Sequence, residues 1–156
     1  MTDMYLSVSL EAKHDFDTGA VTRRLGIEPT QIRKLGTPMH PGHDALYKYN
    51  SWEWDTGHIS ADDAGELIAQ AAAMFQSRAT VMRELADEYG GKWAIVLDGY
   101  VHSGYAPTVL LPPDFVEFCA AIGAIFQYVI DISYDYTSKG GAARGTAEDR
   151  PDTHRG

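Results

Sequence analysis

Alternating apolar and polar positions predict strands in five parts of the chain. The clearest is the first, in which Leu6, Val8 and Leu10 are separated by polar residues. Such a period of two places one face of a strand against a core and leaves the other face in contact with water. Aromatic and β-branched residues support the same interpretation elsewhere. The predicted strands cover 4–12, 46–55, 92–102, 108–111 and 126–136.

Apolar residues that recur every three or four positions predict helices between these strands. Gly26 stands where a helix would end in a left-handed residue. Ser60 followed by Asp63 resembles a capping box at the start of a longer run, with Asp in place of the usual Glu. The predicted helices cover about 18–25, 64–89 (as one helix or a pair) and 112–122.

The order of these elements favours an α+β fold. We expect an antiparallel or mixed sheet with helices packed mainly on one face, built from split βαβ, or ferredoxin-like, units. The length of 156 residues fits one domain, which the pattern assigns to residues 1–136. Residues 137–156 lose all apolar periodicity and consist largely of small, polar and charged residues, which predicts a disordered tail.

The net charge of −9 is unevenly distributed along the chain. Residues 1–50 contain six basic and six acidic residues, whereas residues 51–136 contain three basic and thirteen acidic ones. An acidic chain repels the phosphate backbone, so no nucleic acid partner is expected. The acidic part could attract a basic protein partner, or it could simply keep the domain in solution.

Several classes of protein are not indicated by this sequence. Cys119 is the single cysteine, so no disulfide framework is expected, and its place on an apolar helical stripe predicts an inert core residue. The first residues lack a basic segment and a long apolar run, and no stretch approaches 18 apolar residues. We therefore expect neither a signal peptide nor a membrane span, and a cytoplasmic location. No nucleophile elbow, P-loop or dinucleotide fingerprint is present, and no cofactor is expected.

Carboxylates and a histidine occur on one face of three predicted strands. Glu53, Asp98 and Asp131 alternate with apolar neighbours, and His102 shares the parity of Asp98. If these strands are neighbours, the four side chains could meet on one sheet face and carry out general acid–base chemistry. A sheet face that only contacts water explains the same pattern.

Tyrosines provide a second set of candidates. Tyr47, Tyr49 and Tyr105 occur in or next to predicted strands and turns, where they could form part of a binding surface. Aromatic residues are equally common on half-buried strands without any binding role.

A metal site is the weakest of the candidates. His40 and His43 lie three residues apart, next to Asp44, and could bind a divalent ion. The proline and glycine between them leave their directions open, and a third ligand would have to come from elsewhere in the chain. No metal is therefore expected.

The chain resembles a known bacterial domain-of-unknown-function family, the one numbered 4279. The resemblance covers about residues 4–136 and is carried by structural motifs. These are Tyr5, the run Leu25-Gly26-Ile27-Glu28-Pro29-Thr30, Gly36, Trp52, Leu111-Pro112, Ile122-Gly123 and Asp131-Ile132. It implies an α+β fold and brings no catalytic residues. Such proteins are similar in size to small bacterial immunity and partner-binding proteins.

These observations favour a non-catalytic binding module that recognises a protein partner, of an immunity-like or regulatory kind. The alternative is a small-ligand-binding protein or an enzyme that uses the carboxylates and the histidine on the sheet face. A third hypothesis is a homodimer in which an edge strand pairs with its own copy.

Overall fold

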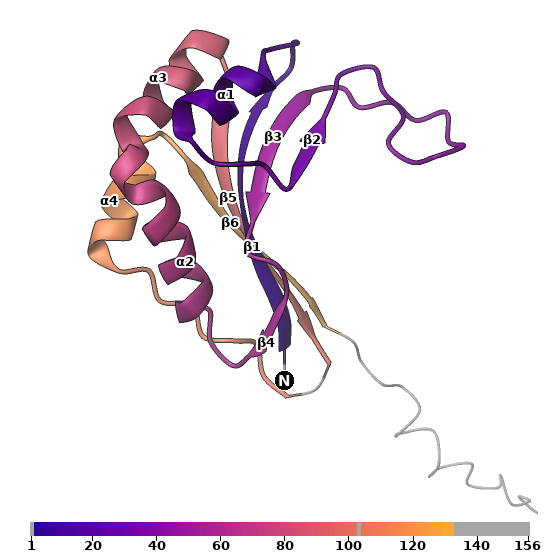
Figure 1. Ribbon diagram of the computed structural model, residues 1–156. Coiled ribbons are helices and arrows are strands. Elements are labelled where there is room, and N and C mark those ends of the chain that lie inside the picture. The colour runs from indigo at the N-terminus through magenta and orange to yellow at the C-terminus, as the bar shows by residue number, and fades with distance from the viewer. Residues whose placement is uncertain (1, 103, 133–156) are drawn as a thin grey trace, which may run out of the picture.

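The computed structural model describes residues 2–102 and 104–132. The predicted tail, 137–156, and the end of the last predicted strand, 133–136, lie outside the described residues. In the described part, six strands form one sheet and four α-helices lie on one side of it (Figure 1). In chain order the elements are β1 (Thr2–Ala12), α1 (Thr18–Leu25), β2 (Gln31–Arg33), β3 (Asn50–Asp55), β4 (Ile59–Ala61), α2 (Gly65–Phe75), a 3-10 turn (Gln76–Arg78), α3 (Ala79–Tyr89), β5 (Lys92–Val101), α4 (Pro113–Ala121) and β6 (Ile125–Ile132).

The sheet is mixed and contains two split βαβ units. Its strand order is β2-β3-β1-β5-β6, and β4 pairs with the first residues of β1. β1 and β2 are both antiparallel to β3, which lies between them, so β1-α1-β2 is one split unit. β3 and β5 flank β1 in the same way and are connected through α2 and α3. β6 adds a parallel strand beside β5. The predicted α+β fold with split βαβ units is confirmed.

The hydrophobic core lies between the sheet and the helices. Leu6, Val8 and Leu10 of β1 are completely buried, as the alternating pattern predicts. Trp52 of β3 lies opposite Leu10, and its indole Nε1 donates a hydrogen bond to Thr22 Oγ1 of α1 at 3.0 Å. The indole of a second buried tryptophan in β5 donates to a backbone carbonyl of α3. Both indoles therefore join the sheet to the helices that cover it.

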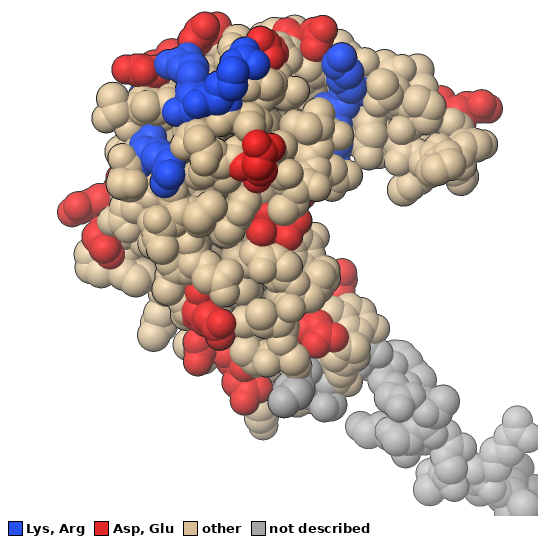
Figure 2. Space-filling model, viewed as in Figure 1, with Lys and Arg blue, Asp and Glu red and all other residues tan. Residues whose placement is uncertain are grey.

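The other face of the sheet is not covered by helices, and we call it the open face. A segment of residues 34–49, which we call the arm, extends from the sheet on this side (Figure 1). Backbone hydrogen bonds from Gly36 to Tyr47 and from Met39 to Ala45, both 2.9 Å, close the arm on itself. In the view of Figure 2, Lys and Arg side chains lie over the upper half of the molecule, whereas the lower half carries Asp and Glu.

The arm corrects one sequence prediction. The predicted strand 46–55 is wrong over residues 46–49, because Leu46 and Tyr47 pair within the arm rather than with β1, and residues 48–49 form a bend. The pairing of β1 with β3 starts at Ala12 and Asn50. Residues 46–49 therefore lie outside the sheet.

Two further predictions near the helices are wrong. Ser60 does not begin a capping box, because it lies in β4 and pairs with Asp3. α2 starts after Ala64 without a side-chain cap, and the Asp63 carboxylate accepts a hydrogen bond from the Gly65 amide. The predicted strand 108–111 is reduced to a single bridge at Thr108.

The predicted helical segment 64–89 is a helix pair. α2 and α3 are separated by one 3-10 turn, at Gln76–Arg78. β2 and β4 were not predicted, since each has three residues and is too short for periodicity to show. Among the described residues, no helix has the length and apolar character needed to cross a membrane.

The buried side chain of Asn50 holds the base of the arm. Its Oδ1 accepts a hydrogen bond from the Leu35 amide at 2.7 Å, and its Nδ2 donates to Asp15 Oδ1 at 2.6 Å and to the Phe16 carbonyl. We expect Asn50→Ala to lower the free energy of unfolding by about 1–3 kcal/mol, because three hydrogen bonds of this buried amide are lost and the buried Phe16 carbonyl is left without this donor. Urea unfolding measures this, with Asp44→Ala on the exposed arm as a control that stays within about 0.5 kcal/mol of wild type. An unchanged midpoint for Asn50→Ala would contradict the assignment.

Candidate functional site

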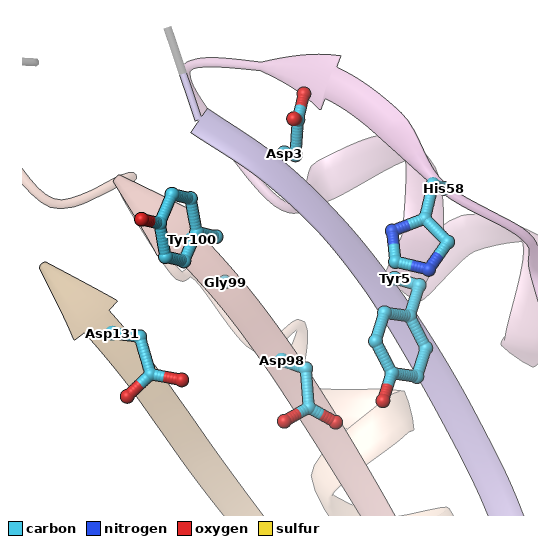
Figure 3. A pocket seen from close by; sticks show the side chains of 7 residues that line it. All are labelled: Asp3, Tyr5, His58, Asp98, Gly99, Tyr100 and Asp131. Carbon is cyan, nitrogen blue, oxygen red and sulfur yellow. The ribbon is translucent and has the colours of Figure 1, made fainter. Parts of the chain in front are cut away.

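A concavity opens at one end of the open face, where β1 begins and where β5 and β6 end. Its volume is about 320 Å³. Figure 3 shows its side chains, which come from three neighbouring strands and the segment before β4. The residues that line it are Asp3, Tyr5, His58, Asp98, Gly99, Tyr100 and Asp131. We call it the acidic hollow.

Strand register brings these residues together. Antiparallel pairing of β1 with β5 places Tyr5 opposite Asp98 and Asp3 opposite Tyr100. Parallel pairing of β5 with β6 places Tyr100 opposite Asp131. Directly paired residues project their side chains from the same face of a sheet. The three aspartates and the two tyrosines therefore all project from the open face (Figure 3).

Two histidines extend the acidic hollow. The ring of His58 lies beside that of Tyr5, with centroids 4.6 Å apart. His102 follows the end of β5, and its Nε2 lies 2.7 Å from Asp3 Oδ2. The His102 ring also packs edge-on against Tyr100 at 4.6 Å. His102 therefore adjoins the hollow through two of its lining residues.

These contacts change the acidity of two groups. The hydrogen bond from His102 holds the pKa of the Asp3 carboxyl below its usual value. Partial burial, together with the negative charge of the adjacent Asp98, raises the pKa of Tyr5 to about 12. Tyr5 is thus a neutral donor beside an ionised carboxylate at neutral pH, and Asp3 is an anion.

The chemistry of the acidic hollow suits a cation. None of its lining residues is a lysine or arginine, and three are aspartates. Carboxylates form short charge-assisted hydrogen bonds with ammonium and guanidinium groups, and tyrosine faces attract cations. Among the described residues, no group of three or more His, Cys, Asp or Glu is placed to hold a metal ion. His40 and His43 lie at the tip of the arm, with ring centroids 5.7 Å apart.

The carboxylates expected to meet on one sheet face do share the open face, but only some meet in one concavity. Asp98 and Asp131 both line the acidic hollow. Glu53 does not, because it pairs with Ser9, four residues along β1 from Tyr5, which corresponds to about 13 Å of strand. The Glu53 carboxylate instead forms a 2.7 Å ion pair with Arg33 of β2.

The candidate tyrosines lie away from the acidic hollow. Tyr47 and Tyr49 pack edge to face at the base of the arm, with centroids 5.9 Å apart, near the opposite end of the open face. Tyr105 follows β5 and its side chain is 96% exposed. The seven candidate residues therefore divide between the two ends of the open face and a loop.

Sequence reasoning missed five of the seven residues that line the acidic hollow, namely Asp3, Tyr5, His58, Gly99 and Tyr100. Asp3 and Tyr5 occupy the same alternate positions as the polar residues of the first predicted strand. The alternating pattern therefore already indicated that both side chains lie on the polar face of that strand. The placement of Tyr5 opposite Asp98 and of Asp3 opposite Tyr100 depends on the register of β1 against β5, which no local pattern gives. His58 lies in the turn before β4, a strand that was not predicted.

Comparison with known proteins places the chain in a family. The family model described as a domain of unknown function, DUF4279, matches residues 2–133. The chain belongs to this family. No curated protein and no solved structure matches it. The DUF4279 match spans every strand and helix described above, including all residues of the acidic hollow.

The acidity of Tyr5 gives a prediction that depends on pH. Because its pKa is raised in the folded protein, the contribution of Tyr5 to stability is complete below pH 10 and is lost as pH rises towards 12. We expect Asp98→Asn to lower the pKa of Tyr5, since it removes the nearby negative charge. Tyrosinate absorbance, recorded with and without Tyr5→Phe in each background, isolates this group. An identical Tyr5 titration in wild type and Asp98→Asn would be inconsistent with the contact.

Proposed function

We propose that this protein is a binding module whose acidic hollow receives a basic side chain, Lys or Arg, of a protein partner. The observation that carries the proposal is the convergence of Asp3, Asp98 and Asp131 in one concavity with Tyr5 and Tyr100. Each of these residues comes from a paired strand, so the site is rigid before any partner binds. A backbone that is already fixed avoids the entropic cost of ordering a loop when the partner binds.

The size of the acidic hollow supports a single inserted side chain. Its volume of about 320 Å³ lies at the lower end of the range for small-molecule pockets. A guanidinium group could form paired hydrogen bonds with one aspartate, while its flat face stacks on a tyrosine ring. The rest of such a partner would lie on the rim of the open face.

The surrounding charge supports a basic partner as well. The lower half of the molecule in Figure 2, where β4 and the ends of β5 and β6 lie, carries acidic and no basic side chains in that view. A field of one sign steers oppositely charged partners and raises their association rate, with a strong dependence on salt.

One observation favours a second function, in which the hollow serves a small ligand or substrate. His102 and Asp3 form a 2.7 Å pair at the edge of the hollow, an arrangement that suits proton transfer. The pair is about half-exposed, and it involves only one of the three aspartates of the hollow. A binding role for a basic side chain therefore accounts for more of the site.

Selection from a random displayed peptide library tests the proposal. We expect the peptides retained by the wild-type protein to be enriched in Lys or Arg. The double variant Asp98→Asn/Asp131→Asn should weaken binding of those peptides about tenfold or more, because charge-assisted hydrogen bonds are lost. Titration calorimetry with one selected peptide measures the change.

A matched control removes the same charge elsewhere. Asp44→Asn/Glu117→Gln neutralises two exposed carboxylates, on the arm and on α4, and should bind the peptide like wild type. Selected peptides without basic residues, or full binding by Asp98→Asn/Asp131→Asn, would refute the proposal. If acetyl-arginine amide alone bound as tightly as the peptides, the small-ligand function would replace it.

A further inference from the structure

A second, larger hollow lies at the opposite end of the open face. Its volume is about 660 Å³, and it is formed where β1 ends and where β5 and β6 begin. Ala94 of β5 and Ile125 of β6 are paired residues that form its floor, and Tyr49 at the base of the arm lines one side. We call it the basal hollow.

The floor of the basal hollow is apolar and accessible. Ile125 is 55% exposed, although its side chain is apolar and β-branched. Tyr49 is half-buried, and burial raises the pKa of its phenol, so it stays neutral at physiological pH. The floor therefore offers apolar surface that a ligand could cover.

Three lysines surround this apolar floor. Lys13 follows β1, Lys48 belongs to the arm and Lys92 begins β5, and all three line the hollow. Within residues 2–102 and 104–132, none of their ammonium groups forms an ion pair. Four of the arginines in the same part of the chain are paired with carboxylates, so the lysines stand out as available cations.

One carboxylate also lines the basal hollow. Glu11 lies opposite Lys92 in the pairing of β1 with β5, and burial raises the pKa of its carboxyl, an effect that the nearby charge of Arg33 only partly offsets. The three lysines and Glu11 leave a balance of +2 at the hollow. The net charge of the whole chain is −9, so this positive balance is local.

We propose that the basal hollow binds a small organic anion with an apolar body, such as an aliphatic or aromatic carboxylate. Its apolar part would lie over Ala94 and Ile125, and its anionic group would contact the lysines at the rim. Apolar pockets with a few convergent polar groups are the usual form of small-ligand sites. Lysine amines that converge on an anion form charge-assisted hydrogen bonds.

This site is independent of the function proposed for the acidic hollow. Lys92 and Tyr100, one from each hollow, are eight residues apart on β5, which corresponds to about 26 Å of strand. A small anion in the basal hollow cannot reach the three aspartates. Binding at one end is therefore measurable without the other.

Displacement of anilinonaphthalene sulfonate, a fluorescent aromatic anion, tests the proposal. We expect saturable binding of one dye per chain, with displacement by decanoate and much weaker displacement by decanol at the same concentration. Substitution of the lysines, as Lys13→Gln/Lys48→Gln/Lys92→Gln, should weaken decanoate binding about tenfold or more. Ile125→Gln should weaken it by removing apolar contact.

Two control variants match these changes outside the hollow. Lys34→Gln removes an exposed lysine and Val116→Gln an exposed apolar side chain on α4, and both should bind decanoate like wild type. The single variant Lys48→Gln changes a residue of the arm rather than of the sheet. It therefore tests one of the three ammonium groups without risk to the fold. A cooperative urea transition for each variant shows that the dye is not reporting a loosely packed state.

Two outcomes would overturn the proposal that the basal hollow binds an organic anion. Equal displacement by decanol and decanoate would show an apolar patch without anion recognition and would overturn it, as would wild-type affinity in the triple lysine variant. Asp98→Asn/Asp131→Asn should leave decanoate binding unchanged. The two hollows can therefore fail or succeed separately.

Discussion

The structure depends on the pairing of β1 with strands on both of its sides. Thr2–Glu11 pair with β5, and Ser7–Ala12 also pair with β3. Because side chains alternate along a strand, this pairing turns the apolar residues of β1 towards the helices and its polar residues towards the open face. A slip of one residue would exchange the two faces. The core and both hollows therefore follow from the register of one central strand.

Local sequence signals were sufficient to predict helices whose ends are marked by capping residues. They were also sufficient to predict which residues of one strand share a face. α1 is observed where it is predicted, because Asp17 caps its first turn through the Ala20 amide and Gly26 adopts the left-handed conformation after it. Each strand's own alternation also puts Asp98 and Asp131 on the same face. β2 and β4 left no such signal, since their few residues are held by partners distant in the sequence.

Which residues meet in the acidic hollow could not be predicted from local patterns, because it depends on how the strands pair. Tyr5 contacts Asp98, and Asp3 meets Tyr100, only in the observed register of β1 against β5. Glu53 has the right parity for the same face, yet Arg33 from β2 holds it elsewhere. A carboxylate's strand face is thus predictable from its neighbours in sequence, whereas its partners are set by contacts between distant segments.

The open face carries opposite charges at its two ends, and the separation between them explains how both persist. The acidic hollow lies where β1 begins and the lysines of the basal hollow lie near where it ends. The ends are about 26 Å apart along β5, several times the Debye length of about 8 Å at physiological ionic strength. Exposed charges at that distance are screened from each other, so neither group neutralises the other. One sheet face can therefore carry an acidic end and a basic end on the same paired strands.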